Sequence, residues 1–270
     1  MQSILLNNGI SMPVIGYGTY KITEEFHPKE CVLQALEAGY RRIDTATLYR
    51  NEKQIGEALS ECGIPREKLF ITTKLWTNVR KEEDVAPAFD GMCSNLRTDY
   101  IDMLLIHWPV QDNPSVWRGM EKLYKQHCVR AIGVSNFKEH HIEEILSEGS
   151  ITPALNQVEL HPHFQQKDLR NYCAHHNITV EAWSPLMRGK ALDLAELQEL
   201  AARYKKSVSQ IILRFDIQSG LTVIPKTIHS ARMRENLDIF DFKISDEDMK
   251  KIEALDKNER AYRDPDNHGF

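Results

Sequence analysis

Four side chains with acid–base chemistry occupy related positions in the first half of the chain. Asp44, Lys74 and His107 each stand at the end of a short apolar segment with the length and β-branched content of a buried strand. Parallel strands of one sheet point their carboxyl ends toward the same rim, so we expect these three residues to converge there. Tyr49 follows Asp44 by five residues, close enough to lean over the same rim. An Asp, a Tyr, a Lys and a His gathered in this way predict a proton-transfer site.

The elements that must position these residues alternate between strand and helix patterns. The eight predicted strands cover residues 15–18, 41–44, 69–74, 101–106, 129–134, 154–158, 179–183 and 222–225. Helical patterns fill the gaps, for example from Cys31 to Ala38, where Gly39 is the expected C-cap. Strict alternation predicts an α/β protein with a parallel sheet and helices outside it. Eight such units in about 250 residues favour a single (β/α)₈ TIM barrel, in one domain covering residues 1–270.

An open doubly wound sheet is the alternative architecture. A G-x-G-x-x-G fingerprint would favour it, but Gly16-Tyr17-Gly18 is followed by Lys21 where the third glycine would stand. At the N-terminus, residues 3–6 and 10–15 are strand-like, and Asn7-Asn8-Gly9 between them suits a tight turn. We therefore expect an N-terminal β-hairpin that closes the bottom of the barrel.

Composition excludes several classes of function. Hydrophobic residues make up 41% of the 270 residues and charged residues 27%, which is ordinary for a globular protein. The net charge of −5 argues against binding to nucleic acid or to a membrane surface. No apolar run approaches the ~20 residues of a membrane span. The five cysteines are widely spaced and form no C-x-x-C pair, which is typical of a reducing compartment. We expect a cytoplasmic, soluble monomer.

Polar side chains also follow the later predicted strands. They are Ser135, Asn136, Gln157, Trp183, Ser184, Lys226 and Thr227. Capping of the next helix explains only Ser135, Ser184 and Thr227 well. The repeated pattern indicates that one rim of the barrel carries a second set of polar groups, in addition to the four acid–base residues.

Several longer motifs occur in a characteristic order. They are Gly39-Tyr40-Arg41-Arg42-Ile43-Asp44, Tyr49-Arg50-Asn51-Glu52, Lys74-Leu75-Trp76, Ile106-His107-Trp108-Pro109, Ala131-Ile132-Gly133-Val134-Ser135-Asn136, Asn156-Gln157-Val158-Glu159 and Val223-Ile224-Pro225-Lys226-Thr227. On these motifs the chain resembles the aldo-keto reductases along nearly its whole length. Ala182-Trp183-Ser184-Pro185-Leu186 and the short acidic end Asp264-Pro265-Asp266 make it most similar to the bacterial diketogluconate and glyoxal or methylglyoxal reductases.

The resemblance implies an NADPH-dependent oxidoreductase that reduces small aldehydes, dicarbonyls such as methylglyoxal, and keto-sugars. Asp44, Tyr49, Lys74 and His107 would be its catalytic residues. A free tyrosine, with a pKa of about 10, is a poor acid, and Lys74 beside Tyr49 would lower that pKa. Asp44 would hold Lys74 charged, and His107 would orient the carbonyl or share in proton transfer. An ordinary buried ion pair beside a rim aromatic is the alternative interpretation of the same residues.

The resemblance also implies a cofactor site on the later strands. Ser135, Asn136 and Gln157 would bind the nicotinamide carboxamide, and Trp183 would stack on the ring, although such a tryptophan is more often part of a core. Gly18, Thr19, Asp44, Ser184 and Leu186 belong to the same expected set. Lys226, Thr227 and Arg232 would bind the 2′-phosphate, and Glu235 and Asn236 would contact the adenine. In the alternative, Arg232 is simply a solvated helix charge.

Aromatic residues near the rim predict the shape of the substrate pocket. Tyr20, Trp76 and Trp108 would line it together with His107. The tail after Asp256 is short and polar, so it offers little apolar surface to a large ligand, and we expect small carbonyl substrates. In the alternative, Trp76 and Trp108 pack against the barrel and select nothing.

Histidine pairs at 140–141, 161–163 and 175–176 suggest metal ligands only superficially. No third ligand stands at a suitable spacing, and adjacent histidines on a helix are expected to point to different faces, so we expect no metal. Two other functions stay open. A non-catalytic NADPH-binding regulatory or structural protein could share the fold, and a phosphate-site isomerase would need a Gly-rich anion loop that Pro225-Lys226-Thr227 does not form.

Overall fold

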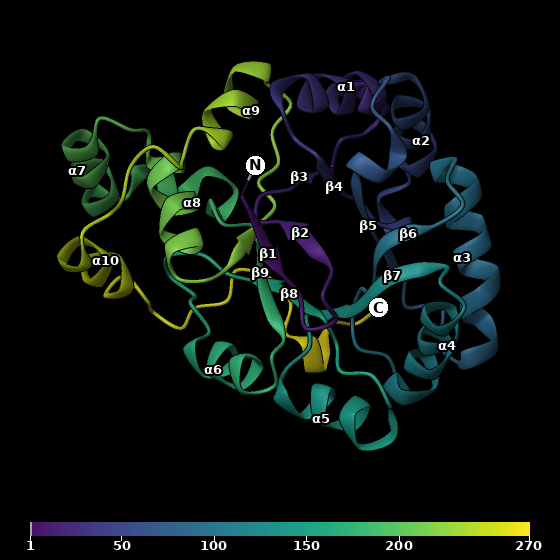
Figure 1. The fold of residues 1–270 in the computed structure, drawn as a ribbon. Coiled ribbons are helices and arrows are strands. Elements are labelled where there is room, and N and C mark those ends of the chain that lie inside the picture. Colours follow the sequence, from purple (N-terminus) through teal and green to yellow (C-terminus); the bar gives the residue numbers. More distant parts are fainter. Residues whose placement is uncertain (1) are drawn as a thin grey trace.

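A computed structural model describes residues 2–270 and shows an eight-stranded parallel sheet surrounded by helices (Figure 1). The strands are β3 (Tyr17–Gly18), β4 (Arg42–Asp44), β5 (Phe70–Leu75), β6 (Ile101–Ile106), β7 (Val129–Ser135), β8 (Leu155–Glu159), β9 (Thr179–Trp183) and β10 (Thr222–Val223). They pair in sequence order from β3 to β10. A parallel bridge between Ile15 and Val223 joins the two edges, so the sheet curls back on itself. The predicted (β/α)₈ fold is confirmed.

The seam between the first and last strands is less regular than the sequence pattern predicts. β3 and β10 have two residues each, although four were expected for both. The chain still approaches closely there: Gly16 donates to the Val223 carbonyl at 2.8 Å and Gly18 to the Pro225 carbonyl at 3.2 Å. A Cβ at Gly18 would lie 2.7 Å from the Ile224 carbonyl oxygen. Glycine at position 18 therefore allows the seam to close.

The helices follow the strands as predicted. They are α1 (Pro28–Ala38), α2 (Glu52–Glu61), α3 (Glu82–Leu96), α4 (Asn113–Lys125), α5 (Glu139–Glu148), α6 (Lys167–His175), α7 (Ala195–Tyr204), α8 (Val208–Gln218), α9 (Ser230–Leu237) and α10 (Asp246–Glu253). Gly39 ends α1 in a left-handed conformation, as a C-cap glycine should. Helices α7 and α10 lie beside α8 outside the main ring (Figure 1), over a separate apolar cluster. No helix of the described chain is long and apolar enough to cross a membrane.

The predicted N-terminal hairpin is present. Antiparallel β1 (Ser3–Leu5) and β2 (Ser11–Pro13) cross one end of the barrel (Figure 1). The side-chain amide of Asn7 donates to the Pro153 carbonyl at 3.0 Å, and that of Asn8 donates to the Arg130 carbonyl at 2.9 Å. These partners lie just before β8 and near the start of β7, so the hairpin covers the amino ends of the strands. An apolar cluster beneath it contains Met12, Phe70, Met103 and Leu105. The chemistry is thereby confined to the opposite rim.

The contact between α2 and α3 predicts unequal effects of alanine at two helical glycines. A Cβ at Gly56 would lie 2.1 Å from the backbone oxygen of Asn95, whereas one at Gly91 would meet nothing within 4 Å. We expect Gly56→Ala to lower the free energy of unfolding by about 1–3 kcal/mol, because α3 must move. Gly91→Ala should raise it by up to about 1 kcal/mol through helix propensity alone. Urea unfolding measures both, and equal effects would contradict this account of the packing.

Candidate active site

A buried ion pair forms the centre of the functional rim. Asp44 is the last residue of β4, and its Oδ1 atom lies 2.5 Å from Nζ of Lys74 on the neighbouring β5. Both side chains are at most 1% exposed. Lys74 also donates to the Thr45 carbonyl at 2.8 Å. Burial raises the pKa of Asp44 and lowers the pKa of Lys74, and their mutual attraction opposes both shifts. The pair is therefore a fixed, shared charge site in a poorly solvated interior.

Tyr49 and His107 complete the group. Tyr49 ends the short 3₁₀ helix Thr47–Tyr49, and Nζ of Lys74 lies 5.2 Å from the centre of its ring. The His107 ring stands edge-on to Tyr49 with ring centres 5.6 Å apart. The structure thus brings all four predicted acid–base residues together, on the carboxyl ends of β4, β5 and β6 and in the loop after β4.

The electrostatics of Tyr49 differ from the expectation. Burial raises the pKa of Tyr49 well above 10, and the Asp44 carboxylate raises it further. The ammonium of Lys74 lies near the ring but is paired with Asp44, so its attraction for the phenolate is outweighed by burial and by the Asp44 charge. The phenol consequently keeps its proton at neutral pH. Burial also lowers the pKa of His107 well below 6.5, and Lys74 lowers it further, so this imidazole is neutral.

A buried polar network extends from the ion pair into the barrel, and part of it escaped the sequence analysis. The side-chain amide of Gln157 donates to Asp44 at 2.7 Å and to Glu181 at 2.8 Å. Glu181 is paired with Arg42 and also accepts from the Thr222 hydroxyl at 2.8 Å. Arg42 stands two residues before Asp44, so strand alternation places both on one face. That spacing was a signal for an inward arginine.

Hydrogen bonds connect the predicted nicotinamide-site residues across four strands. Ser135 donates through its hydroxyl to the Gln157 carbonyl at 2.8 Å. Asn136, in a left-handed conformation, donates to the His107 carbonyl at 2.9 Å and accepts from the Trp183 indole at 2.9 Å. The ends of β6, β7, β8 and β9 are therefore fixed relative to one another. Trp183 stays half-buried.

Aromatic side chains surround Tyr49 and His107. The Tyr20 ring centre lies 5.0 Å from that of Tyr49, and the Trp76 ring centre lies 5.3 Å from that of His107. Phe270, which the sequence analysis did not consider, packs against Trp76 with ring centres 4.9 Å apart. It also contacts Trp108, which is buried. The expectation that the tail adds little apolar surface is therefore wrong at its last residue.

Comparison with known proteins identifies the family. The model for the aldo/keto reductase family matches residues 14–257. The chain belongs to the aldo/keto reductase family. It is 48% identical to a glyoxal reductase of Bacillus subtilis, over 98% of this chain and 96% of the relative. It is 40% identical to the methylglyoxal reductase DkgA of Escherichia coli, over 98% of each chain. A structure of a Gox0644 variant with NADPH is 36% identical, with a TM-score of 0.95, over 100% of this chain and 99% of that one.

Membership of the aldo/keto reductases makes the protein an NADP-dependent oxidoreductase, and its residues fit that cofactor. The side-chain amide of Gln157 donates both of its hydrogens, one to Asp44 and one to Glu181, so its side-chain oxygen is free to accept a hydrogen bond from the cofactor. Lys226 and Arg232 are exposed and form no ion pair within residues 2–270. Unpaired cations beside the start of α9 suit a 2′-phosphate.

The remaining predicted cofactor residues have their own protein contacts in this aldo/keto reductase. Thr19 is buried and donates through its hydroxyl to the Asp44 carbonyl at 2.8 Å. Glu235 accepts a hydrogen bond from Ser207, the N-cap of α8, and Asn236 is buried. Thr227 accepts from the backbone of His229 at 3.2 Å. These contacts tie the segment around α9 to the barrel.

Ser184 and Leu186 lie in the strained loop after β9. Ser184, Met187, Arg188 and Gly189 all have positive φ angles. A 3₁₀ segment, Met187–Asp193, follows Leu186, and the Arg188 guanidinium lies 4.3 Å from the centre of the Tyr262 ring. Tyr262 belongs to the C-terminal tail and also meets Trp183, with ring centres 5.2 Å apart. The tail therefore contacts both the loop after β9 and the predicted nicotinamide platform.

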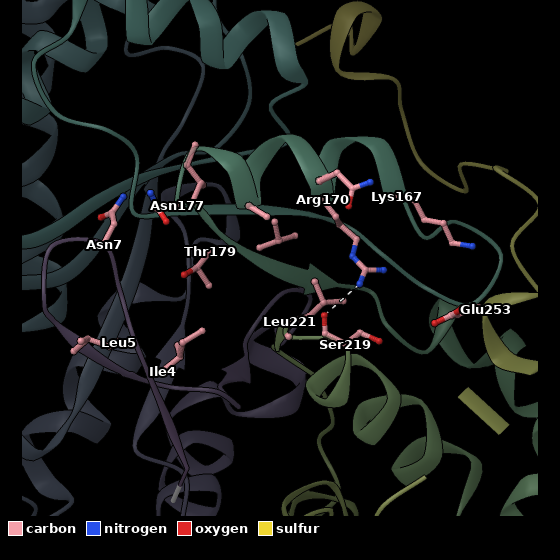
Figure 2. A pocket seen from close by; sticks show the side chains of 15 residues that line it. Ile4, Leu5, Asn7, Lys167, Arg170, Asn177, Thr179, Ser219, Leu221 and Glu253 are labelled. Atoms are coloured by element: carbon pink, nitrogen blue, oxygen red, sulfur yellow. Dashed lines mark hydrogen bonds between the residues drawn. The ribbon is translucent and has the colours of Figure 1, made fainter. Parts of the chain in front are cut away.

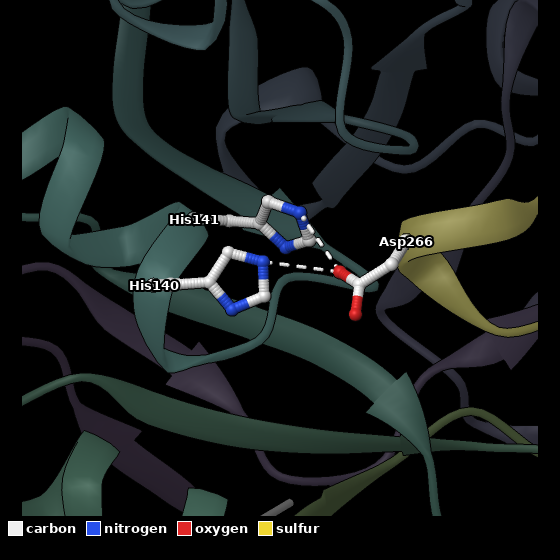
Figure 3. A group of neighbouring side chains, drawn as sticks. All are labelled: His140, His141 and Asp266. Carbon is white, nitrogen blue, oxygen red and sulfur yellow. Dashed lines mark ion pairs between the residues drawn. The ribbon is translucent and has the colours of Figure 1, made fainter.

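A cluster of charged residues fastens the tail to the start of α5 (Figure 3). Lys138 lies 2.7 Å from Asp264 and 2.6 Å from Asp266. Nε2 of His140 and Nε2 of His141 lie 3.0 and 3.3 Å from the same oxygen of Asp266. The expectation that adjacent histidines diverge is wrong here, because their ring centres are only 4.0 Å apart.

The same cluster has the ligand types of a metal site, but its hydrogen bonds suit a clasp better. Nδ1 of His141 accepts the Lys138 backbone N–H at 3.2 Å, so the neutral ring carries its proton on Nε2, the atom that faces Asp266. A cation would have to displace that proton and compete with the Lys138 ammonium for Asp266. The cluster therefore holds the tail, and Phe270 with it, over the rim.

A cavity of about 860 Å³ lies at the other end of the barrel (Figure 2). It is lined by the hairpin residue Ile4 and by Thr179 at the start of β9, with Arg170 of α6 donating to the Ser219 carbonyl at 3.3 Å. It is remote from the Asp44–Lys74 pair, so it is not the site of the acid–base residues.

Proposed function

We propose that this aldo/keto reductase reduces small aldehydes, dicarbonyls such as methylglyoxal, and keto-sugars to alcohols, with Tyr49 as the general acid. The observation that carries the proposal is the position of the Tyr49 phenol, held beside the Asp44–Lys74 pair and edge-on to His107. Bound NADPH supplies the hydride to the carbonyl carbon. The protein must then place the carbonyl oxygen and deliver a proton to it.

The geometry supports a separate role for each acid–base residue. Tyr49 donates its phenolic proton to the carbonyl oxygen as negative charge develops there. The phenolate that remains lies beside the Lys74 ammonium, which stabilises it. Asp44 keeps Lys74 in place and charged in the dry interior. Neutral His107 orients the carbonyl oxygen through a ring N–H, because a neutral imidazole retains one donor nitrogen.

The proposed cofactor contacts follow the polar rim. Ser135, Asn136 and Gln157 hold the carboxamide, and Trp183 stacks on the nicotinamide ring. Gly18, Thr19, Ser184 and Leu186 border the middle of the cofactor. Lys226, Thr227 and Arg232 bind the 2′-phosphate, with Glu235 and Asn236 at the adenine. The unpaired exposed cations support this assignment. A monomeric state and a cytoplasmic location stay predictions.

Substrate size is the first property to test. Tyr20, Trp76 and Phe270 crowd the rim around Tyr49 and His107, and this crowding favours a small carbonyl substrate over a large one. The similarity to a glyoxal reductase points the same way. We expect kcat/KM with NADPH to be at least about tenfold higher for methylglyoxal or a nitrobenzaldehyde than for a steroid ketone. A preference for the steroid would overturn this account of the pocket.

Removal of the Tyr49 hydroxyl tests the acid. Tyr49→Phe should lower kcat by about 10²–10⁴-fold, since the proton donor alone is lost, and leave NADPH affinity nearly unchanged. Tyr124→Phe on α4 is the matched control, because it removes a phenol oxygen far from the rim and should keep wild-type kcat. A Tyr49→Phe enzyme that retains more than about a tenth of wild-type kcat would remove Tyr49 from this role.

Coenzyme choice tests the phosphate site. Arg232→Ala should weaken NADPH binding by about tenfold, or roughly 1.4 kcal/mol, because one cation facing the 2′-phosphate is lost. NADH lacks that phosphate, so its Kd should change little. Arg234→Ala is the control, since it is an exposed arginine on the same helix. If Arg232→Ala weakens both coenzymes equally, Arg232 does not contact the phosphate. Fluorescence titration measures both Kd values.

A further inference from the structure

A second buried ion pair crosses the barrel interior below the site. Arg42 on β4 and Glu181 on β9 are both inaccessible to solvent. The two guanidinium nitrogens of Arg42 lie 2.5 and 2.7 Å from the two carboxylate oxygens of Glu181, a bidentate contact. Burial of two charges costs several kcal/mol per ion, and apolar residues of similar volume often give a protein of equal stability. Stability alone therefore does not explain the pair.

Gln157 connects this pair to the acid–base residues. Its side-chain nitrogen donates to Oδ2 of Asp44 at 2.7 Å and to Oε1 of Glu181 at 2.8 Å. Two carboxylates, one on each side, therefore hold the amide nitrogen and fix the orientation of the group. The amide oxygen must then face away from both carboxylates. An apolar residue at position 181 would leave Gln157 free to rotate.

We propose that Arg42 and Glu181 are positioning residues for the reaction: they orient Gln157 toward the cofactor and keep the interior charge around Asp44 and Lys74 balanced. The inference rests on the proposed function for its catalytic part. The hydrogen-bonded network that Gln157 joins holds two cations, Arg42 and Lys74, and two carboxylates, Asp44 and Glu181, so the formal charges within it cancel. Loss of either member of the Arg42–Glu181 pair leaves one uncompensated charge beside the Asp44–Lys74 pair, which in turn lies beside Tyr49.

The coupling between the two pairs is consistent with this assignment. Burial raises the pKa of Asp44 and Lys74 opposes that shift, while the charge of Glu181 raises the same pKa and that of Arg42 lowers it. The other titratable groups that face Tyr49 or the Asp44–Lys74 pair are unchanged in every variant below: Tyr20, Glu52, His107 and Tyr262.

The pH dependence of alcohol oxidation by NADP⁺ separates charge from structure, because oxidation needs Tyr49 as its phenolate, and the positive nicotinamide ring of bound NADP⁺ favours that phenolate relative to the free enzyme. Arg42→Met leaves a net negative charge, so the pH of half-maximal kcat should rise by roughly one unit. Glu181→Gln keeps the shape but leaves a net positive charge, so that pH should fall. The double variant Arg42→Met/Glu181→Gln should return to the wild-type value. If the pair were merely structural, the two single variants would not shift the pH of half-maximal kcat in opposite directions.

NADPH affinity tests the orientation of Gln157 without catalysis. The double variant Arg42→Met/Glu181→Gln retains an acceptor for Gln157, so its Kd for NADPH should match that of the wild type. Arg42→Met/Glu181→Leu removes that acceptor and should bind NADPH about tenfold more weakly, with an unchanged pH midpoint. Asp102→Asn, at the separate buried cluster with Arg66 and Arg130, is the control for damage to a buried ion pair. Asp102→Asn should change neither the Kd for NADPH nor the pH of half-maximal kcat.

Two results would overturn the inference. One is pH midpoints that stay in place or move in the same direction in both single variants. The other is an equal NADPH Kd in the two double variants. Single variants with an unpaired buried charge can fail to fold, and the two double variants, which leave neither charge, then decide the question through Kd. A wild-type protein that binds NADPH but reduces no carbonyl would contradict the proposed function, while the Kd comparison still tests the role of Glu181.

Discussion

The ion pair between Lys74 and Asp44 is the constraint around which the rest of the site is arranged. A lysine ammonium with no exposed surface needs a carboxylate partner and further acceptors, and it has Asp44 and the Thr45 carbonyl. Neighbouring parallel strands supply that geometry, because their carboxyl ends meet at one rim. The hairpin covers the amino ends of the strands over an apolar cluster, on the side of the barrel opposite the acid–base residues.

Burial then determines the protonation states of the two groups beside the pair. Tyr49 keeps its proton and His107 stays neutral, because a charged form of either would be poorly solvated. A neutral donor and a neutral imidazole are suited to receive a polar, uncharged carbonyl. The C-terminal tail completes the aromatic surroundings of the site. Asp264 and Asp266 hold the tail at the start of α5, and Phe270 packs against Trp76 at the rim.

Residues whose positions depend on strand geometry were predictable from the sequence. Asp44, Lys74 and His107 follow short apolar segments, and the parallel arrangement brings such strand ends together. Arg42 and Glu181 lie on the same strands as predicted site residues, at a spacing of two, so alternation alone would have identified them as inward. The spacing of two residues along each strand was the signal for this second buried ion pair.

The tail could not be predicted in this way. Phe270 and Asp266 lie in a segment with little regular structure, and their places depend on contacts with residues more than a hundred positions earlier in the chain. The short 3₁₀ segment around residues 265–267 has no periodic pattern that would reveal such contacts. The pKa of Tyr49 was mispredicted for a related reason, since the sequence shows which charges are near but not how deeply the phenol is buried.

The turnover of Lys74→Met tests the central role of the ion pair most directly. The measurement is the single-turnover rate of NADPH oxidation with methylglyoxal, on folded protein saturated with NADPH. The account predicts a rate at least about 100-fold below wild type, because the phenolate left on Tyr49 loses its neighbouring positive charge. A rate within about tenfold of wild type would contradict it, and would show that proton transfer does not depend on Lys74.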